Sequence, residues 1–103
     1  MNLKSFMESL GDNAPPAGLS PYLLSLWYDA KGDWTKAHDI IQDEENKNGS
    51  WIHAYLHRKE GDIWNADYWY RRAGKTRPSH SLDDEWKEIA NDILSNSKIS
   101  RDL

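Results

Sequence analysis

Two histidines spaced one helical turn apart are the residues of this chain best suited, by type and position, to carry chemistry. His53 and His57 occupy positions i and i+4 of an expected helix, so their imidazoles leave the same face and can reach one metal ion. A zinc site needs further ligands, and the chain has neither a cysteine nor a His-Glu-x-x-His motif to supply them. The candidates for these further ligands are Asp29, Asp33 and Glu60.

Two other uses of the histidines stay open at this point. His38 or His57 could act as a general acid or base, because the pKa of an imidazole lies near neutrality. Alternatively, the histidines are structural and are hydrogen-bonded to carboxylates or backbone carbonyls. The sequence contains no nucleophile elbow, phosphate-binding glycine loop or dinucleotide fingerprint. We therefore assign no catalytic residue, cofactor or metal ion, and expect a protein that is not an enzyme.

A repeated turn positions these histidines. The segment Lys31-Gly32-Asp33 returns 29 residues later as Glu60-Gly61-Asp62, and each copy stands between two apolar, aromatic runs. A glycine ends one helix and the aspartate after it caps the next, so each pair of helices is antiparallel. The sequence therefore predicts helices over 21–31, 34–46, 51–60 and 63–75.

Shorter signals define the segments around these helices. Asn48-Gly49 is expected to break the chain between the two hairpins, with Ser50 capping the helix that follows. Ser81 begins a capping box for a last helix, whose apolar face would cover the hairpins. A short N-terminal helix is predicted from the apolar stripe of Leu3, Phe6, Met7 and Leu10. The result is one all-α domain: N-terminal helix 1–11, linker 12–20, hairpins 21–47 and 50–77, capping helix 81–96 and tail 97–103.

The spacing of small and large residues in the hairpins resembles that of tetratricopeptide (TPR) or Sel1-like repeats. The second unit carries the family spacing at Ala66, Tyr70, Ala73 and Pro78. The first unit matches at Leu24, Ser25, Tyr28, Ala37 and Ile41. The run 51–62 is also similar to short, uncharacterised bacterial proteins of this size, from which no activity follows.

The resemblance implies where side chains meet. In such repeats the second helix of one unit faces the first helix of the next, so His38 should join His53 and His57 at a polar seam between the hairpins. It also implies a concave face formed by Tyr22, Leu26 and Asp29 of the first unit and Trp51, Tyr55, Arg58 and Lys59 of the second. Tryptophan, tyrosine and arginine are the residue types that dominate binding hot spots.

We therefore expect a non-catalytic interaction module whose binding face is Tyr22, Trp51, Tyr55, Arg58 and Lys59. The partner would be a peptide segment or a second copy of the chain. The N-terminal stripe competes for the same face, either within its own chain or, in a homodimer, across copies. The alternative function is a small-molecule or metal site, with or without catalytic activity, at the histidine seam.

Composition excludes other classes of function. A net charge of −4 gives no electrostatic footprint for nucleic acid or an anionic membrane surface. No apolar run approaches the ~20 residues of a membrane span, and without cysteine there are no disulfides, so we expect a cytoplasmic protein. Because hydrophobic residues make up only 38% of the chain, large aromatics must build the core. We expect this of Trp27, Trp34, Trp64, Trp69 and Trp86.

Overall fold

Helices make up the regular structure of this chain. The computed structural model describes residues 1–101, and side chains as far as residue 96. Within that range the fold is all-α, without a strand, as predicted. The helices are α1 (Leu3–Glu8), the short 3-10 helix η1 (Ser9–Gly11), α2 (Pro21–Ala30), α3 (Trp34–Ile41), α4 (Lys47–Lys59), α5 (Ile63–Arg72) and α6 (Leu82–Arg101). None of these helices is long and apolar enough to cross a membrane.

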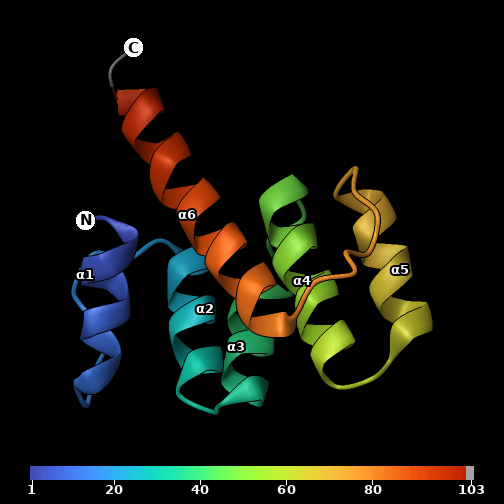
Figure 1. Cartoon of the computed structure of the whole chain (residues 1–103), viewed down its shortest axis with the longest axis horizontal. Coiled ribbons are helices and arrows are strands. Elements are labelled where there is room, and N and C mark those ends of the chain that lie inside the picture. Colours follow the sequence, from blue (N-terminus) through green and yellow to red (C-terminus); the bar gives the residue numbers. More distant parts are fainter. Residues whose placement is uncertain (102–103) are drawn as a thin grey trace.

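The repeated Gly-Asp turn joins α2 to α3 and α4 to α5 (Figure 1). Gly32 and Gly61 adopt φ values of 90° and 87°, in the left-handed region that favours glycine. Asp33 and Asp62 then cap α3 and α5, each by accepting a backbone N–H with its side chain. Both turns are thus confirmed as the end of one helix and the start of the next.

The connection between the hairpins differs from the prediction. Asn46, not Ser50, caps α4, and its side chain accepts the N–H of Gly49 at 2.9 Å. The pair expected to break the chain therefore lies in the first turn of α4, and α3 ends at Ile41 instead of near 46. Glycine is needed because a Cβ at position 49 would lie 1.9 Å from the backbone oxygen of Glu44. The α3–α4 connection passes close to the first turn of α4, where Glu44 meets Gly49.

The predicted lengths of the last two helices also change. α5 ends at Arg72, where Ala73 caps it, instead of near residue 75. α6 begins at Leu82 as expected but runs to Arg101, beyond the predicted end at 96. Part of the expected tail is therefore helical, while residues 102–103 lie outside the described part of the chain.

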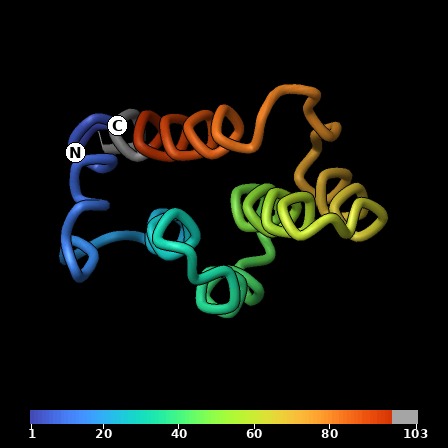
Figure 2. Tube along the Cα trace, turned by 60° about the horizontal axis from the view of Figure 1, so that its bottom comes forward, coloured from blue at the N-terminus to red at the C-terminus, as the bar shows by residue number. Residues whose placement is uncertain are grey.

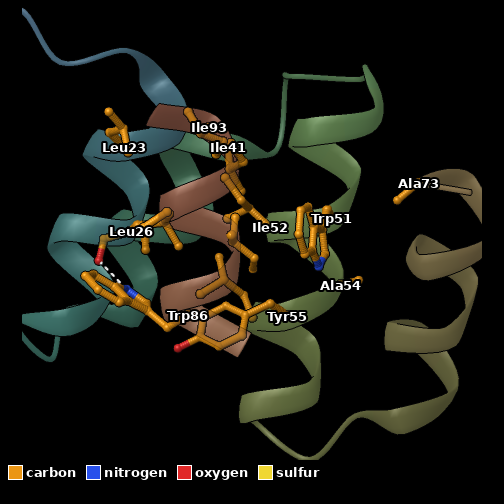
Figure 3. Close-up of a cluster of buried hydrophobic side chains, with 14 of the residues drawn as sticks. Leu23, Leu26, Ile41, Trp51, Ile52, Ala54, Tyr55, Ala73, Trp86 and Ile93 are labelled. Atoms are coloured by element: carbon orange, nitrogen blue, oxygen red, sulfur yellow. Dashed lines mark hydrogen bonds between the residues drawn. The ribbon is translucent and has the colours of Figure 1, made fainter. Parts of the chain in front are cut away.

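α6 is the element that closes the core. It packs across α2 and α4 and also contacts α1 (Figures 1 and 2). Its Trp86 donates to the backbone oxygen of Leu26 at 3.0 Å, which ties α6 to α2 (Figure 3). On the same indole, Phe6 of α1 stacks with ring centroids 5.7 Å apart. The capping helix therefore joins both ends of the chain to the hairpins.

One tryptophan departs from the predicted core. Trp27 and Trp86 are buried, and Trp34 and Trp69 pack against the core while half-buried. Trp64 is 80% exposed, because the buried stripe of α5 runs through Ala66, Tyr70 and Ala73 on the other side of the helix. The expectation that Trp64 belongs to the core is wrong.

Candidate metal centre

Three histidines meet where α4 lies between α3 and α5 (Figures 1 and 2). His38 comes from α3, and His53 and His57 come from successive turns of α4. One ring nitrogen from each lies within 4.8 Å of the others, and the Nε2 atoms of His38 and His53 are 3.1 Å apart. The structure thus brings together the three residues that the sequence placed at the seam.

Close helix packing allows this approach. Ala37, next to His38, is fully buried, so α3 carries a small side chain beside the histidine. Ser25 of α2 donates its hydroxyl to the carbonyl oxygen of Ala37 at 2.8 Å. α3 is thereby fixed on α2 while the His38 ring reaches α4.

Two tryptophans stack on the cluster. The ring of Trp34 lies 5.0 Å from that of His38, and the ring of Trp69 lies 3.9 Å from that of His53, both nearly parallel. Trp34 is held in turn by a 2.8 Å hydrogen bond from its Nε1 to the carbonyl oxygen of Leu56. Aromatic surfaces therefore flank two of the imidazoles and limit their rotation.

His57 is fixed in one tautomer. Its Nδ1 lies 2.6 Å from Oε1 of Glu60, and an ionised carboxylate can only accept a hydrogen bond. Nδ1 therefore carries a proton, so in the neutral ring the lone pair lies on Nε2. The side-chain amide nitrogen of Asn65 lies 3.4 Å from that Nε2 and is a donor suited to an unprotonated nitrogen. A histidine that binds a metal through Nε2 needs this tautomer.

Burial favours the neutral form of both His53 and His38. Burial lowers the pKa of the His53 imidazole to about 4. Positive charge on His57, His38 or Arg72 acts in the same direction. Burial also lowers the pKa of His38, with a further contribution from His57, while two nearby carboxylates oppose the change. Neutral imidazoles offer the lone pairs that a metal ion requires.

The separation between His38 and His53 fits a transition-metal ion. Zinc binds imidazole nitrogen at ~2.0–2.1 Å in a tetrahedron, which puts ligand nitrogens about 3.3 Å apart. The 3.1 Å separation between His38 and His53 is close to that value, and His57 lies within 4.8 Å. At this distance one of the two Nε2 atoms donates a hydrogen bond to the other. Metal binding requires the donated proton to move to Nδ1 of the same ring.

The acidic residues expected as further ligands lie elsewhere. Asp29 is 2% exposed and accepts hydrogen bonds from Tyr55 and Lys59. Asp33 caps α3, and Glu60 is held at Nδ1 of His57, away from the ligating nitrogen. Within residues 1–96, no other histidine or acidic side chain joins the three histidines as a fourth ligand.

The aromatic residues expected to form an open binding face are covered. Trp51 and Tyr55 are only 4% and 2% exposed, because α6 packs on α4 at this surface. Trp51 donates through Nε1 to Glu85 of α6 at 3.3 Å, and Tyr55 donates its hydroxyl to Asp29 at 2.7 Å. Their burial contradicts a free aromatic face at these positions.

The polar side chains of the same surface are used within the chain. Arg58 donates to Oε1 of Glu85 at 2.7 Å, and Lys59 donates to Oδ1 of Asp29 at 2.9 Å. Tyr22 is half-buried. The sequence did not indicate that buried acids would neutralise the two cations.

The N-terminal stripe packs within its own chain, although not on the expected face. Phe6 is fully buried against Trp86 of α6, whereas Met7 is 36% exposed. α6, and not α1, therefore covers the surface formed by α2 and α4. The N-terminal helix α1 packs beside α6, through the contact of Phe6 with Trp86.

Sequence reasoning named Glu60 as a candidate ligand but did not place Asn65 or Trp69 beside the histidines. Asn65 and Trp69 lie four residues apart on the face of α5 that meets α4, and Glu60 follows His57 by three residues. The spacing of the last pair was a usable signal for a carboxylate partner on the same helix.

Comparisons with models of known families, with curated proteins and with solved structures gave no match.

Proposed function

We propose that this chain binds a divalent transition-metal ion through His38, His53 and His57, with Zn²⁺ as the ion that fits best. Three imidazole nitrogens within 4.8 Å of one another carry the proposal. Imidazole suits Zn²⁺, Cu²⁺ and Ni²⁺, whereas Mg²⁺ and Ca²⁺ prefer oxygen. Tetrahedral coordination, which Zn²⁺ favours, agrees with the spacing of the two closest nitrogens.

The surroundings of the histidines support this function. Glu60 orients His57 through Nδ1, which is the carboxylate–histidine arrangement found behind metal ligands in general. The lowered pKa values mean that His53 and His38 bind a metal at pH 7 without first losing a proton to solvent. The stacked tryptophans reduce the conformational entropy that the two rings lose on binding.

The test is metal-dependent thermal unfolding of the protein without an affinity tag. At a free Zn²⁺ concentration of 100 times Kd, binding adds about 2.7 kcal/mol, equivalent to a Tm increase of about 10–20 °C for a domain of this size. We expect His38→Asn to lose most of this increase, while His80→Asn keeps it. His80 is the matched control because its imidazole is exposed against Glu88, outside the cluster. An equal increase in both variants, or none in the wild type, would refute the proposal.

A second candidate function, binding of an acidic peptide, is favoured by the outer face of α5. Trp64 is 80% and Tyr68 39% exposed, and the Arg72 guanidinium lies over the Tyr68 ring at 5.8 Å. Exposed tryptophan, tyrosine and arginine on one helix face form a typical hot-spot composition, and the arginine favours an acidic partner. The interaction function expected from the sequence thus moves from the covered face to α5.

Peptide-display selection tests this second function. Selection on the wild type, with removal of clones that also bind Trp64→Ser, should enrich sequences rich in aspartate and glutamate. Enrichment without an acidic excess, or equal retention by the variant, would contradict it.

We also propose that the two hairpins are a pair of TPR-like units closed by α6. The proposal is supported by the identical Gly-Asp turns and by the fully buried Ala37 and Ala66, which occupy matching positions in α3 and α5. A small residue there lets the paired helices approach closely.

A further inference from the structure

The three-histidine site is one ligand short of a closed zinc centre. Structural zinc sites have four protein ligands, whereas sites with three keep a position for water or another exchangeable ligand. Within residues 1–96, no additional histidine or carboxylate oxygen lies in the ligand group. Glu60 cannot close the tetrahedron while it holds Nδ1 of His57, because Nδ1 and the ligating Nε2 lie on different edges of the ring.

Charge around the site favours an anion. Neutral imidazoles add no charge of their own to the two positive charges of the metal ion. The carboxylates nearby are Glu60 and Asp62 at His57 and Asp39 near His38, and none of them joins the three ligands. Arg72 adds a cation, because its guanidinium lies 4.9 Å from the ring centre of Trp69, which stacks on His53.

The site is also accessible. His38 is only half-buried, whereas His53 and His57 are 6% and 7% exposed, so the cluster meets solvent beside His38. Trp34 and Trp69 flank the imidazoles on two sides and leave less room for a bulky ligand. A small ligand is therefore the kind that fits.

We propose that the fourth coordination position of the bound metal takes a small, exchangeable monoanion, such as hydroxide, carboxylate or azide, and that Arg72 helps to attract it. This inference rests on the proposed metal-binding function. With such a ligand, the metal site would bind an exchangeable anion and would not be a purely structural site. Arg72 acts as a positioning residue through its charge, without contact with the metal.

Visible absorption of the Co²⁺-loaded protein tests the proposal, because the bands of Co²⁺ respond to a change of ligand. Titration with sodium azide should change the spectrum of the wild type, and the change should saturate as expected for one azide bound per metal ion. Arg72→Gln should weaken azide binding about two- to fivefold, the range expected for a partly exposed charge interaction. Arg71→Gln is the matched control, because it removes the neighbouring exposed cation, and it should bind azide as the wild type does.

The outcomes separate this inference from the function on which it rests. If Co²⁺ binds in a 1:1 ratio but azide leaves the spectrum unchanged, the fourth position is closed and the inference is wrong, while metal binding stands. If azide binds equally to the wild type and Arg72→Gln, the role of Arg72 is refuted. If Co²⁺ does not bind, the proposed function and the inference both fail. Circular dichroism of each variant shows whether it is folded.

Discussion

Acid should destabilise the metal-free protein through His53. This imidazole has a pKa of about 4 in the folded chain and 6.5 ordinarily, so between these pH values the unfolded chain binds the proton that the folded one refuses. The stability associated with the neutral ring is complete above pH 6.5 and is lost as the pH falls toward 4. The pKa difference corresponds to about 3 kcal/mol, which solvent screening of a cluster open at His38 reduces to about 1–2 kcal/mol.

Chemical denaturation in the presence of a chelator measures this effect. His53→Gln removes the titrating group, and the difference in unfolding free energy between wild type and variant cancels the contributions of other residues. We expect that difference to fall by about 1–2 kcal/mol between pH 7 and pH 4.5. His80→Gln, on the exposed side chain, should lose stability in parallel with the wild type. A difference that is constant, or that grows on acidification, would refute the assignment of a neutral buried imidazole.

Two further substitutions test the fold, each against a matched control in urea denaturation. Gly49→Ala should lower the free energy of unfolding by about 2 kcal/mol or more, because its Cβ would meet the Glu44 carbonyl. Gly11→Ala is the control and should cost less than about 0.5 kcal/mol, because a Cβ there has nothing within 4 Å. Equal effects would contradict the close approach at Gly49. Glu85→Ala should cost about 3–5 kcal/mol, because it removes a buried carboxylate that accepts from the buried Tyr70 phenol and the half-buried Arg58 guanidinium. The exposed Glu88→Ala should be nearly neutral. A mild effect at both positions would show that the buried carboxylate network contributes little.

Local rules predicted the hairpins because their causes are local. A glycine with positive φ followed by an aspartate cap is decided within a few residues, and both copies form as expected. The same locality explains the error at Asn48-Gly49. Asn46 is an equally good N-cap four residues before Ser50, and the choice between them depends on where the α3–α4 connection crosses the helix.

Long-range packing was outside the reach of the sequence pattern. The apolar stripe of α6 predicted a helix with one buried face, but not that this face would cover Trp51 and Tyr55. Trp64, in contrast, could have been placed from periodicity. It precedes Ala66 by two residues, about 200° around a helix, which sets it opposite the stripe formed with Tyr70.

The histidine cluster differs from the other buried polar groups of this chain in the partners of its side chains. Glu85 and Asp29, both buried, accept hydrogen bonds from cations and phenols. His53 is also buried but is paired with another imidazole, His38, and burial disfavours its protonation. Sequences usually agree with their fold at every level, and the exceptions concentrate at functional sites. A metal ion would bind all three imidazoles at once, in place of the hydrogen bonds that His38 makes with His53 and Asn65 makes with His57.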